Sequence, residues 1–217
     1  MNKLAAALTL ACICAMTAPA AQLRVSVKDQ HGRPVADAVV LATPDEPKNA
    51  LHAKPPPDTV DQVDKQFVPY VKPVFVGSRV RFPNSDHIRH QVYSFSPAKK
   101  FELPLYAGTD APPIVFDKPG IVVLGCNIHD WMIGYIYVSE TPFFAKTEVH
   151  GAASINDMPP GEYSVRIWHP GMEKAEETTA QRVSLTADGP ASLDWQLSLT
   201  PGFRVPRVSG AGSPSYP

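Results

Sequence analysis

Apolar and polar residues alternate along most of this chain, with the period of two that a half-buried β-strand shows. Leu23, Val25 and Val27 are separated by polar residues, and a second apolar run covers residues 35–41. The turn-forming residues 29–34 lie between these runs, so the pattern predicts a β-hairpin or two successive strands of a β-sandwich. Residues 43–59 contain five prolines and few apolar positions, which is typical of a linker.

The densest alternation lies between residues 60 and 138. One face of the predicted strand 90–96 carries His90, Val92 and Ser94, and the other face carries Gln91, Tyr93 and Phe95. Further strands are predicted up to residue 126 and again from residue 132, so that Cys126 ends one strand and Met132 begins the next. Two strand ends joined by a short loop hold side chains rigidly.

The composition narrows the classes of fold and function. Twenty-four prolines are spread along the 217 residues and interrupt nearly every stretch long enough for a helix, so we expect an all-β protein. The formal net charge is −1 and the basic residues form no stripe or run, which argues against nucleic acid and membrane surfaces as partners. Residues 201–217 are rich in Pro, Gly and Ser and are predicted to form a disordered tail.

Residues 1–21 have the pattern of an export signal. Lys3 is their only charge, an apolar run covers residues 4–16, and Ala18-Pro19-Ala20 offers small residues for cleavage. This run is too short to cross a bilayer core of about 30 Å. We therefore expect a periplasmic or secreted protein whose mature chain has no membrane span, with a retained N-terminal anchor as the alternative.

The loop at residues 126–132 carries the most informative residues. Cys126, His129 and Met132 follow a Cys-x-x-His-x-x-Met pattern, of which chance predicts only about 0.002 occurrences in a chain of this composition. One thiolate, two imidazoles and a weak thioether form the ligand set of blue-copper electron-transfer sites, whereas structural zinc sites rarely use methionine. The second imidazole is expected from His90 or His87, on a distant strand.

Three other interpretations of this loop stay open. Cys126 and His129 could form a nucleophile and its base, although no third orienting group is apparent. The same ligands would also serve a protein that carries or stores copper without transferring electrons. The third interpretation is a structural or adhesive β-sandwich with a vestigial site.

Around this loop the sequence resembles the cupredoxins, which are β-sandwich electron carriers with one type 1 copper. The shared pattern is Asn84-x-Asp86-x-x-x-His90, a Pro-Gly turn and the Cys126 loop, and it covers about residues 55–140. The loop spacing is like that of amicyanin, and the wider sequence is similar to cupredoxin-type proteins named for methylamine utilisation. Gln91 departs from the pattern, because many cupredoxins have an asparagine there that braces the cysteine loop.

The resemblance implies a Greek-key β-sandwich over residues 51–140 that binds one copper ion per chain. It places the ligands at His90, Cys126, His129 and Met132, with His87 as the competitor of His90. It also implies an exported carrier of single electrons, not an enzyme, whose redox partner is a dehydrogenase or a cytochrome.

The flanking segments resemble a second, smaller sandwich. Residues 22–50 and 141–200 are similar to the two parts of an immunoglobulin-like or carboxypeptidase-regulatory-like domain, and neither part has enough strands to enclose a core alone. We expect one discontinuous accessory β-sandwich, interrupted by residues 51–140. The alternative is two separate extensions packed on the central domain.

Overall fold

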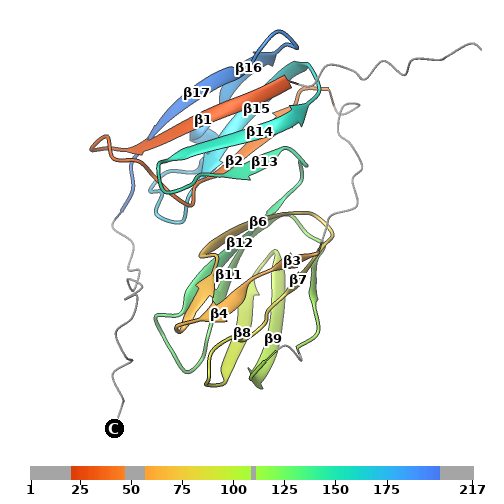
Figure 1. Ribbon diagram of the computed structural model, residues 1–217, viewed down its shortest axis with the longest axis vertical. Coiled ribbons are helices and arrows are strands. Elements are labelled where there is room, and N and C mark those ends of the chain that lie inside the picture. Colours follow the sequence, from red (N-terminus) through yellow and green to blue (C-terminus); the bar gives the residue numbers. More distant parts are fainter. Residues whose placement is uncertain (1–20, 47–56, 109–110, 201–217) are drawn as a thin grey trace, which may run out of the picture.

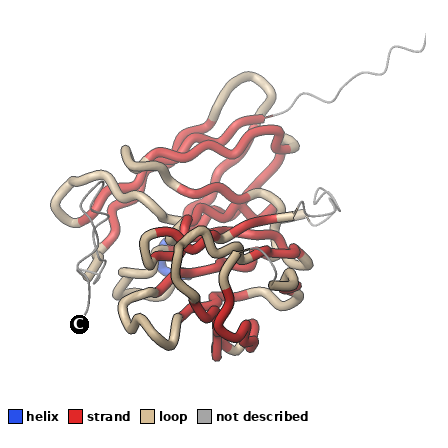
Figure 2. Tube along the Cα trace, turned by 60° about the horizontal axis from the view of Figure 1, so that its bottom comes forward, coloured by secondary structure: helices blue, strands red, loops and turns tan. Residues whose placement is uncertain are grey.

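The computed structural model describes residues 21–46, 57–108 and 111–200, and nearly all of their regular structure is β (Figure 1, Figure 2). The predicted all-β class is therefore confirmed. The strands gather into two lobes, one above the other in Figure 1. The predicted leader and tail lie outside the described residues, except that Ala21, which the leader prediction included, is the first residue of a strand.

The lower lobe, here called the central sandwich, is built from strands that follow one another between residues 58 and 139 (Figure 1). Its larger sheet has the order β6-β12-β11-β8-β9 and consists of β6 (Val71–Phe75), β12 (Ile133–Ser139), β11 (Gly120–Gly125), β8 (His90–Ser96) and β9 (Lys99–Tyr106). The smaller sheet has the order β10-β7-β3 and consists of β10 (Ile114–Phe116), β7 (Ser78–Arg81) and β3 (Asp58–Thr59). A separate hairpin pairs β4 (Asp61–Val63) with β5 (Gln66–Val68).

Alternate residues of these two sheets enclose an apolar core. Val92 and Leu124 of the larger sheet and Phe116 of the smaller one are fully buried in the same cluster. The faces predicted for residues 90–96 agree with the structure, because His90, Val92 and Ser94 are buried whereas Phe95 is 75% exposed.

The upper lobe, here called the split sandwich, is built from both ends of the described chain. One sheet has the order β14-β1-β17 and consists of β14 (Ala152–Met158), β1 (Ala21–Asp29) and β17 (Ala191–Leu197). The other has the order β13-β2-β15-β16 and consists of β13 (Phe144–Lys146), β2 (Val39–Pro44), β15 (Gly161–Trp168) and β16 (Gln181–Leu185). The first two strands of the chain therefore lie in different sheets of a sandwich and do not form a hairpin.

Two local predictions are wrong. The second strand begins at Val39 and not at residue 35, because Asp37 has a φ of 62°, which lies outside the β region. The predicted linker is too long at both ends, since residues 43–44 belong to β2 and residues 58–59 form β3. Residues 47–56 lie outside the described part of the chain.

The two sandwiches meet at a small aromatic contact, here called the joint. Trp168 of β15 packs against Tyr135 and Tyr137 of β12, with ring centroids 5.8 and 5.5 Å apart. The other buried members of this cluster are Val39, Leu41 and Val71. The joint thus connects the larger central sheet to the β2–β15 sheet of the split sandwich.

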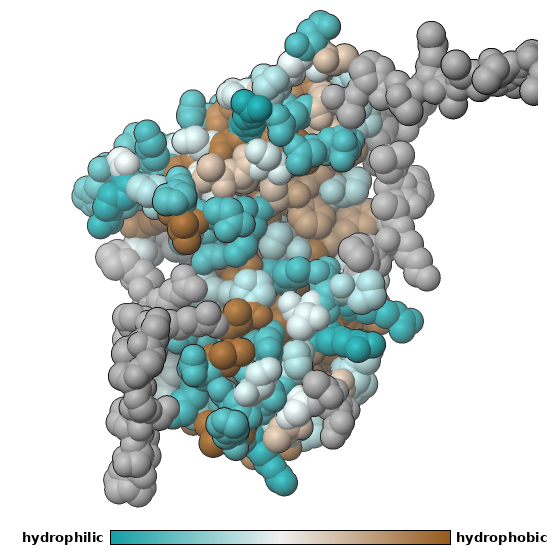
Figure 3. Space-filling view, in the orientation of Figure 1, coloured by the Kyte–Doolittle hydropathy of each residue, from teal (hydrophilic) through white to brown (hydrophobic). Residues whose placement is uncertain are grey.

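The face seen in Figure 3 is mostly hydrophilic, with small and separated apolar patches. Among the described residues, no helix combines the length and the apolar character needed to cross a membrane.

Candidate metal centre

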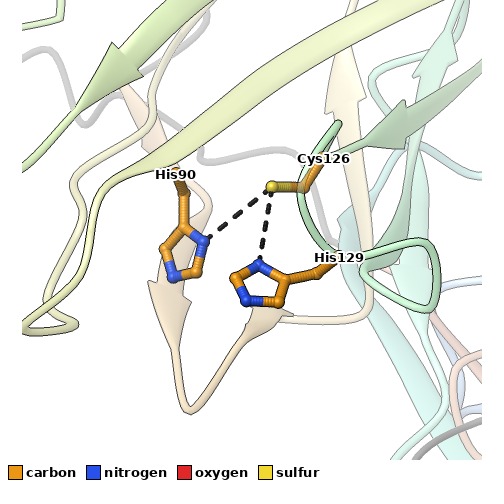
Figure 4. A group of neighbouring side chains, drawn as sticks. All are labelled: His90, Cys126 and His129. Atoms are coloured by element: carbon orange, nitrogen blue, oxygen red, sulfur yellow. Dashed lines mark hydrogen bonds between the residues drawn. The ribbon is translucent and has the colours of Figure 1, made fainter. Parts of the chain in front are cut away.

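Three side chains from two separate segments of the sequence converge at one end of the larger central sheet (Figure 4). His90 is the first residue of β8, Cys126 directly follows β11, and His129 lies in the loop before β12. Gly125, the last residue of β11, pairs with both β8 and β12, so these elements are neighbours here. The Cys126 Sγ lies 3.9 Å from the Nδ1 of His90 and 3.8 Å from the Nδ1 of His129.

This cluster has the size and the donor atoms of a metal site. Metal–sulfur bonds of about 2.3 Å and metal–nitrogen bonds of about 2.0 Å at trigonal angles place sulfur and nitrogen roughly 3.7 Å apart. Both observed distances are close to that value, and both rings present Nδ1 to the sulfur (Figure 4). Within residues 21–46, 57–108 and 111–200, this is the one group of His, Cys and acidic side chains identified as able to hold a metal ion.

The surroundings of Cys126 favour its thiolate. Burial by itself would raise the pKa of the thiol, but hydrogen bonds from His90 and from the backbone N–H groups of Gln91 and Ile128 outweigh burial and lower that pKa. The thiolate is the form of cysteine that binds metals. Cys126 is 3% exposed, so its sulfur is shielded from solvent.

The two histidines differ in their surroundings. Burial would lower the pKa of His90, but hydrogen bonds with Cys126 and Asp86 outweigh it and raise the pKa. The pKa of His129 is lowered, first by burial and then by the nearby charges of His90 and Lys65. His90 is fully buried, whereas His129 is half-buried and is the less enclosed of the two histidines.

Asp86 fixes the orientation of His90. Its Oδ2 lies 2.7 Å from the Nε2 of His90, which leaves Nδ1 to face the sulfur. The carboxylate accepts hydrogen bonds from the backbone N–H groups of Asp64 and Lys65, at 2.7 and 2.9 Å. Those two residues form the turn between β4 and β5, with φ values of 52° and 57°. A carboxylate behind a metal-binding imidazole fixes its tautomer and raises its basicity.

Asn84 ties the segment before His90 to the neighbouring strand. Its Nδ2 donates to the carbonyls of Ile88 and Tyr106 at 2.9 and 2.8 Å, and its Oδ1 accepts the Asp86 N–H at 3.0 Å. The roles of Asn84 and Asp86 are not predicted from the sequence. The available signal was the Asn-x-Asp-x-x-x-His spacing, which places an amide and a carboxylate shortly before the histidine.

The remaining candidate residues have different positions. His87 is exposed and is not part of the cluster. Met132 is 1% exposed and belongs to the same buried core as Cys126, and its N–H donates to the His129 carbonyl at 2.9 Å. Cys126 and Met132 each lie one residue outside the strands that they were expected to end and begin.

Gln91 does not brace the cysteine loop with its side chain. Its Nε2 donates to Glu102 Oε1 at 2.6 Å, on the outer face of the sheet. Its backbone N–H faces the Cys126 sulfur instead.

Comparison with known proteins gives structural matches. No protein-family model and no curated protein sequence matches the chain. Among solved structures, the chain is similar to a copper-containing nitrite reductase from Thermus scotoductus SA-01. The two are 32% identical over 42% of this chain and 25% of that chain, with a TM-score of 0.38. The chain therefore spans about a quarter of that enzyme's length.

Two further similar structures are those of a purple cupredoxin and of an amicyanin variant. A purple cupredoxin from Nitrosopumilus maritimus is 22% identical over 38% of this chain and 99% of that chain, with a TM-score of 0.34. The reduced Cu(I) form of an amicyanin variant is 20% identical over 45% of this chain and 98% of that chain, with a TM-score of 0.35. These similarities extend over less than half of the chain, so its chemistry has to be argued from its own side chains.

Proposed function

We propose that this chain is a type 1 copper protein that passes single electrons between redox partners. The observation that carries the proposal is the convergence of two imidazole Nδ1 atoms, from His90 and His129, on the buried Cys126 sulfur. A soft thiolate combined with imidazoles favours copper over harder cations. Copper, when bound, supplies a one-electron couple between Cu(II) and Cu(I).

The proposed ligands are His90, Cys126, His129 and Met132, with one copper per chain. The cluster geometry supports the first three, and the burial of Met132 in the same core as Cys126 supports the fourth. His90 is held by Asp86, so this ring needs little rearrangement when the charge of the site changes. The partly exposed His129 gives a redox partner its closest approach to the site.

A protein that carries or stores copper is the second candidate, and the same geometry argues against it. Release of the ion would require the buried His90 to turn away from both Cys126 and Asp86. It would also require the loop closed by the His129–Met132 hydrogen bond to open. A preorganised, buried site fits a resident ion better than a transferred one.

We further propose that the protein is exported to the periplasm or secreted, and that it is a carrier and not an enzyme. The leader-like composition of residues 1–21 supports export. The resemblance to cupredoxin-type proteins supports a dehydrogenase or a cytochrome as redox partner and a role in methylamine utilisation. N-terminal sequencing of the exported protein tests the first part, and reduction of the copper by candidate dehydrogenases tests the second.

We also propose that residues 51–140 are an independently folding copper domain, inserted into an accessory sandwich of residues 22–50 and 141–200. The strand pairings of the two lobes support this division, because β1 and β2 pair with strands beyond residue 140. Residues 51–140 expressed alone should give a soluble protein that binds copper. Deletion of residues 141–217 should leave β1 and β2 open to protease, and their continued protection would contradict the division.

The experiment that tests the function is purification with Cu(II), followed by visible and paramagnetic spectroscopy. A thiolate-to-copper charge-transfer band should make the protein intensely blue, with one copper per chain. Cys126→Ser should abolish the colour. Survival of the colour in that variant, or preferential binding of zinc in metal competition, would refute the electron-transfer proposal.

The role of Met132 has its own test. Met132→Leu removes a weak donor and should raise the reduction potential, whereas Met132→Gln supplies an oxygen donor and should lower it. Met158 is a matched control, because it is equally buried but lies in the core of the split sandwich. Met158→Leu should leave the potential unchanged, and an unchanged potential in both Met132 variants would make Met132 a core residue only.

A further inference from the structure

A cleft of about 590 Å³ lies between the two sandwiches. Its walls come from the β11 and β12 end of the central sandwich and from β2, β15 and the 3₁₀ turn η2 (Glu176–Thr179) of the split sandwich. This volume is within the range of small-molecule sites, which are common at domain interfaces. Ile121, 37% exposed, and the ring of Tyr137 provide apolar surface.

The cleft and the candidate metal centre lie at opposite ends of the same two strands. Gly120 pairs with Val138 at the cleft end of β11 and β12, whereas Gly125 pairs with Ile133 at the end next to Cys126. The two sites can therefore be tested independently.

Acidic side chains outnumber basic ones in this cleft. Glu140, Glu176 and Glu177 line it together with one cation, Arg166. The Oε2 of Glu176 accepts a hydrogen bond from the Tyr137 hydroxyl at 2.7 Å. Its Oε1 is buried and accepts no hydrogen bond, but it forms a long ion pair with the Nη1 of Arg166, at 3.5 Å. The long ion pair satisfies this buried acceptor only in part, and a ligand that brings an N–H group would complete its hydrogen bonding.

Side-chain hydrogen bonds hold the turn η2, which carries Glu176. The Thr179 hydroxyl accepts the N–H of Ile167 at 2.8 Å and donates to the carbonyl of Glu176 at 2.7 Å. The indole N–H of Trp195 donates to the Thr179 carbonyl at 2.7 Å. The turn η2 is therefore fixed to both sheets of the split sandwich. Burial raises the pKa of Glu176 and that of Tyr137, as is common for polar groups in binding sites.

We propose that this cleft binds a small organic cation, with an ammonium, amidinium or guanidinium group on an apolar body. The N–H groups of the cation face Glu176, and its apolar body lies against Ile121 and Tyr137. An anion of the same shape meets an excess of carboxylates and is excluded. Because both sandwiches line the cleft, a bound cation contacts both of them and stabilises their relative position. The same cationic chemistry occurs in free metabolites and in arginine or lysine side chains of other proteins.

The test is titration of benzamidine into the isotopically labelled, metal-free full chain, followed by NMR. Saturable shifts should appear at residues of the cleft, with the dissociation constant of about 1–10 mM expected for a fragment of this size. Benzoate and benzyl alcohol are the matched anionic and neutral controls and should show no saturable shifts. Glu176→Gln should weaken benzamidine binding about 5-fold or more. Glu162→Gln, which removes an exposed acid of β15 that does not line the cleft, should not.

Glu140→Gln is a second variant, because Glu140 is exposed and its replacement does not endanger the fold. The affinity for N-acetylarginine amide, compared with that for benzamidine, distinguishes a protein side chain from a free metabolite as the source of the cation. Tighter binding than benzamidine indicates a protein side chain, and weaker binding indicates a free metabolite. Equal binding of benzoate and benzamidine, the absence of any saturable shift, or unchanged binding in both glutamate variants overturns the proposal. The visible spectrum of the copper-loaded chain reports separately on the candidate metal centre.

Discussion

The two sandwiches bury polar side chains for different purposes. In the split sandwich these side chains close connections between strands. Asp29, 6% exposed, accepts hydrogen bonds from two N–H groups of the turn that follows β1. Thr147, 1% exposed, bonds the backbone of Val35 and Ala38 and so holds the segment around Asp37. Both side chains have their hydrogen-bond partners within the split sandwich, and neither belongs to the candidate metal centre.

In the central sandwich several buried or half-buried polar side chains form a connected group around Tyr106 and His90. Gln62 donates to the Tyr106 hydroxyl at 2.6 Å, and Asn84 holds the Tyr106 carbonyl and the segment that leads to Asp86. Asp86 in turn holds His90. Burial raises the pKa of Tyr106 to about 12, so this hydroxyl stays neutral. The difference between the two sandwiches is that successive hydrogen bonds of the central sandwich lead to one side chain, His90. Such a converging set of buried hydrogen bonds indicates a functional site.

The largest effect should come from the residue at which those hydrogen bonds end. His90→Ala removes a fully buried imidazole and leaves Asp86 without its side-chain partner, so copper binding and the blue colour should be lost. His87→Ala is the control, because His87 is exposed and outside the cluster. Copper stoichiometry and visible absorption measure both variants. Loss of colour in the His87 variant with retention in the His90 variant would reverse the assignment.

The next effect tests whether the sandwiches depend on each other. Trp168→Ala removes the largest side chain of the joint and should lower the free energy of unfolding by about 3 kcal/mol or more. Phe95→Ala, at a position that is 75% exposed, should change it by less than about 0.5 kcal/mol. Urea denaturation measures both variants. The blue colour should survive in folded Trp168→Ala protein, and its loss would show that the metal centre needs the split sandwich.

A smaller effect is expected where the central sandwich supports His90 indirectly. Asp86→Asn keeps the shape of the side chain but weakens the orientation of the imidazole, so copper affinity should fall about 10- to 100-fold. Asp64→Asn removes a carboxylate nearby and keeps the backbone N–H that binds Asp86. Competition with a copper chelator measures both affinities. If copper affinity fell equally in the two variants, Asp86 would act through its negative charge and not by orienting His90.

The smallest effect concerns Glu176 at the edge of the joint. Burial raises its pKa from the ordinary value of 4.5, because the carboxylate loses hydration in the folded protein. The contribution of Glu176 to stability is therefore greatest below pH 4.5 and is lost as the pH rises through the raised pKa. Glutamine imitates the neutral acid at every pH. Glu176→Gln should gain stability relative to the wild type between pH 4 and pH 7, by less than about 1 kcal/mol. Denaturant titrations at both pH values check the sign, and a difference that falls with pH would contradict it.

Strand content and strand faces could be predicted from the sequence because their signals are local. The alternation at residues 90–96 is visible within seven positions, and burial in the structure follows it. The start of β2 was misplaced, because the positive φ of Asp37 depends on Thr147, a residue far away in the sequence. A hydrogen bond from a residue distant in the sequence changes the backbone conformation of a segment without changing its pattern of apolar and polar residues.

Only part of the candidate metal centre could be predicted from the sequence. Cys126 and His129 share one loop, so their proximity follows from their spacing. The support from Asp86 depends on backbone donors in the turn between β4 and β5, and nothing in residues 84–90 reveals them. The bond between Tyr137 and Glu176 joins residues 39 positions apart across the two sandwiches, and it likewise has no local signal.

The pairing of β1 with β17 has a consequence for the order in which the protein can fold. Synthesis produces β1 and β2 first, but their partners β14, β15 and β17 come after every strand of the central sandwich. Domains fold as units while the chain emerges, at about 5–20 residues per second, so the last segment, residues 140–197, takes about 3–12 s to follow the finished central sandwich. During that interval the apolar faces of β1 and β2 have no strands to pair with, and unpaired strands promote aggregation. Slower synthesis of residues 140–197 should therefore lower the yield of soluble protein and leave the properties of the folded protein unchanged.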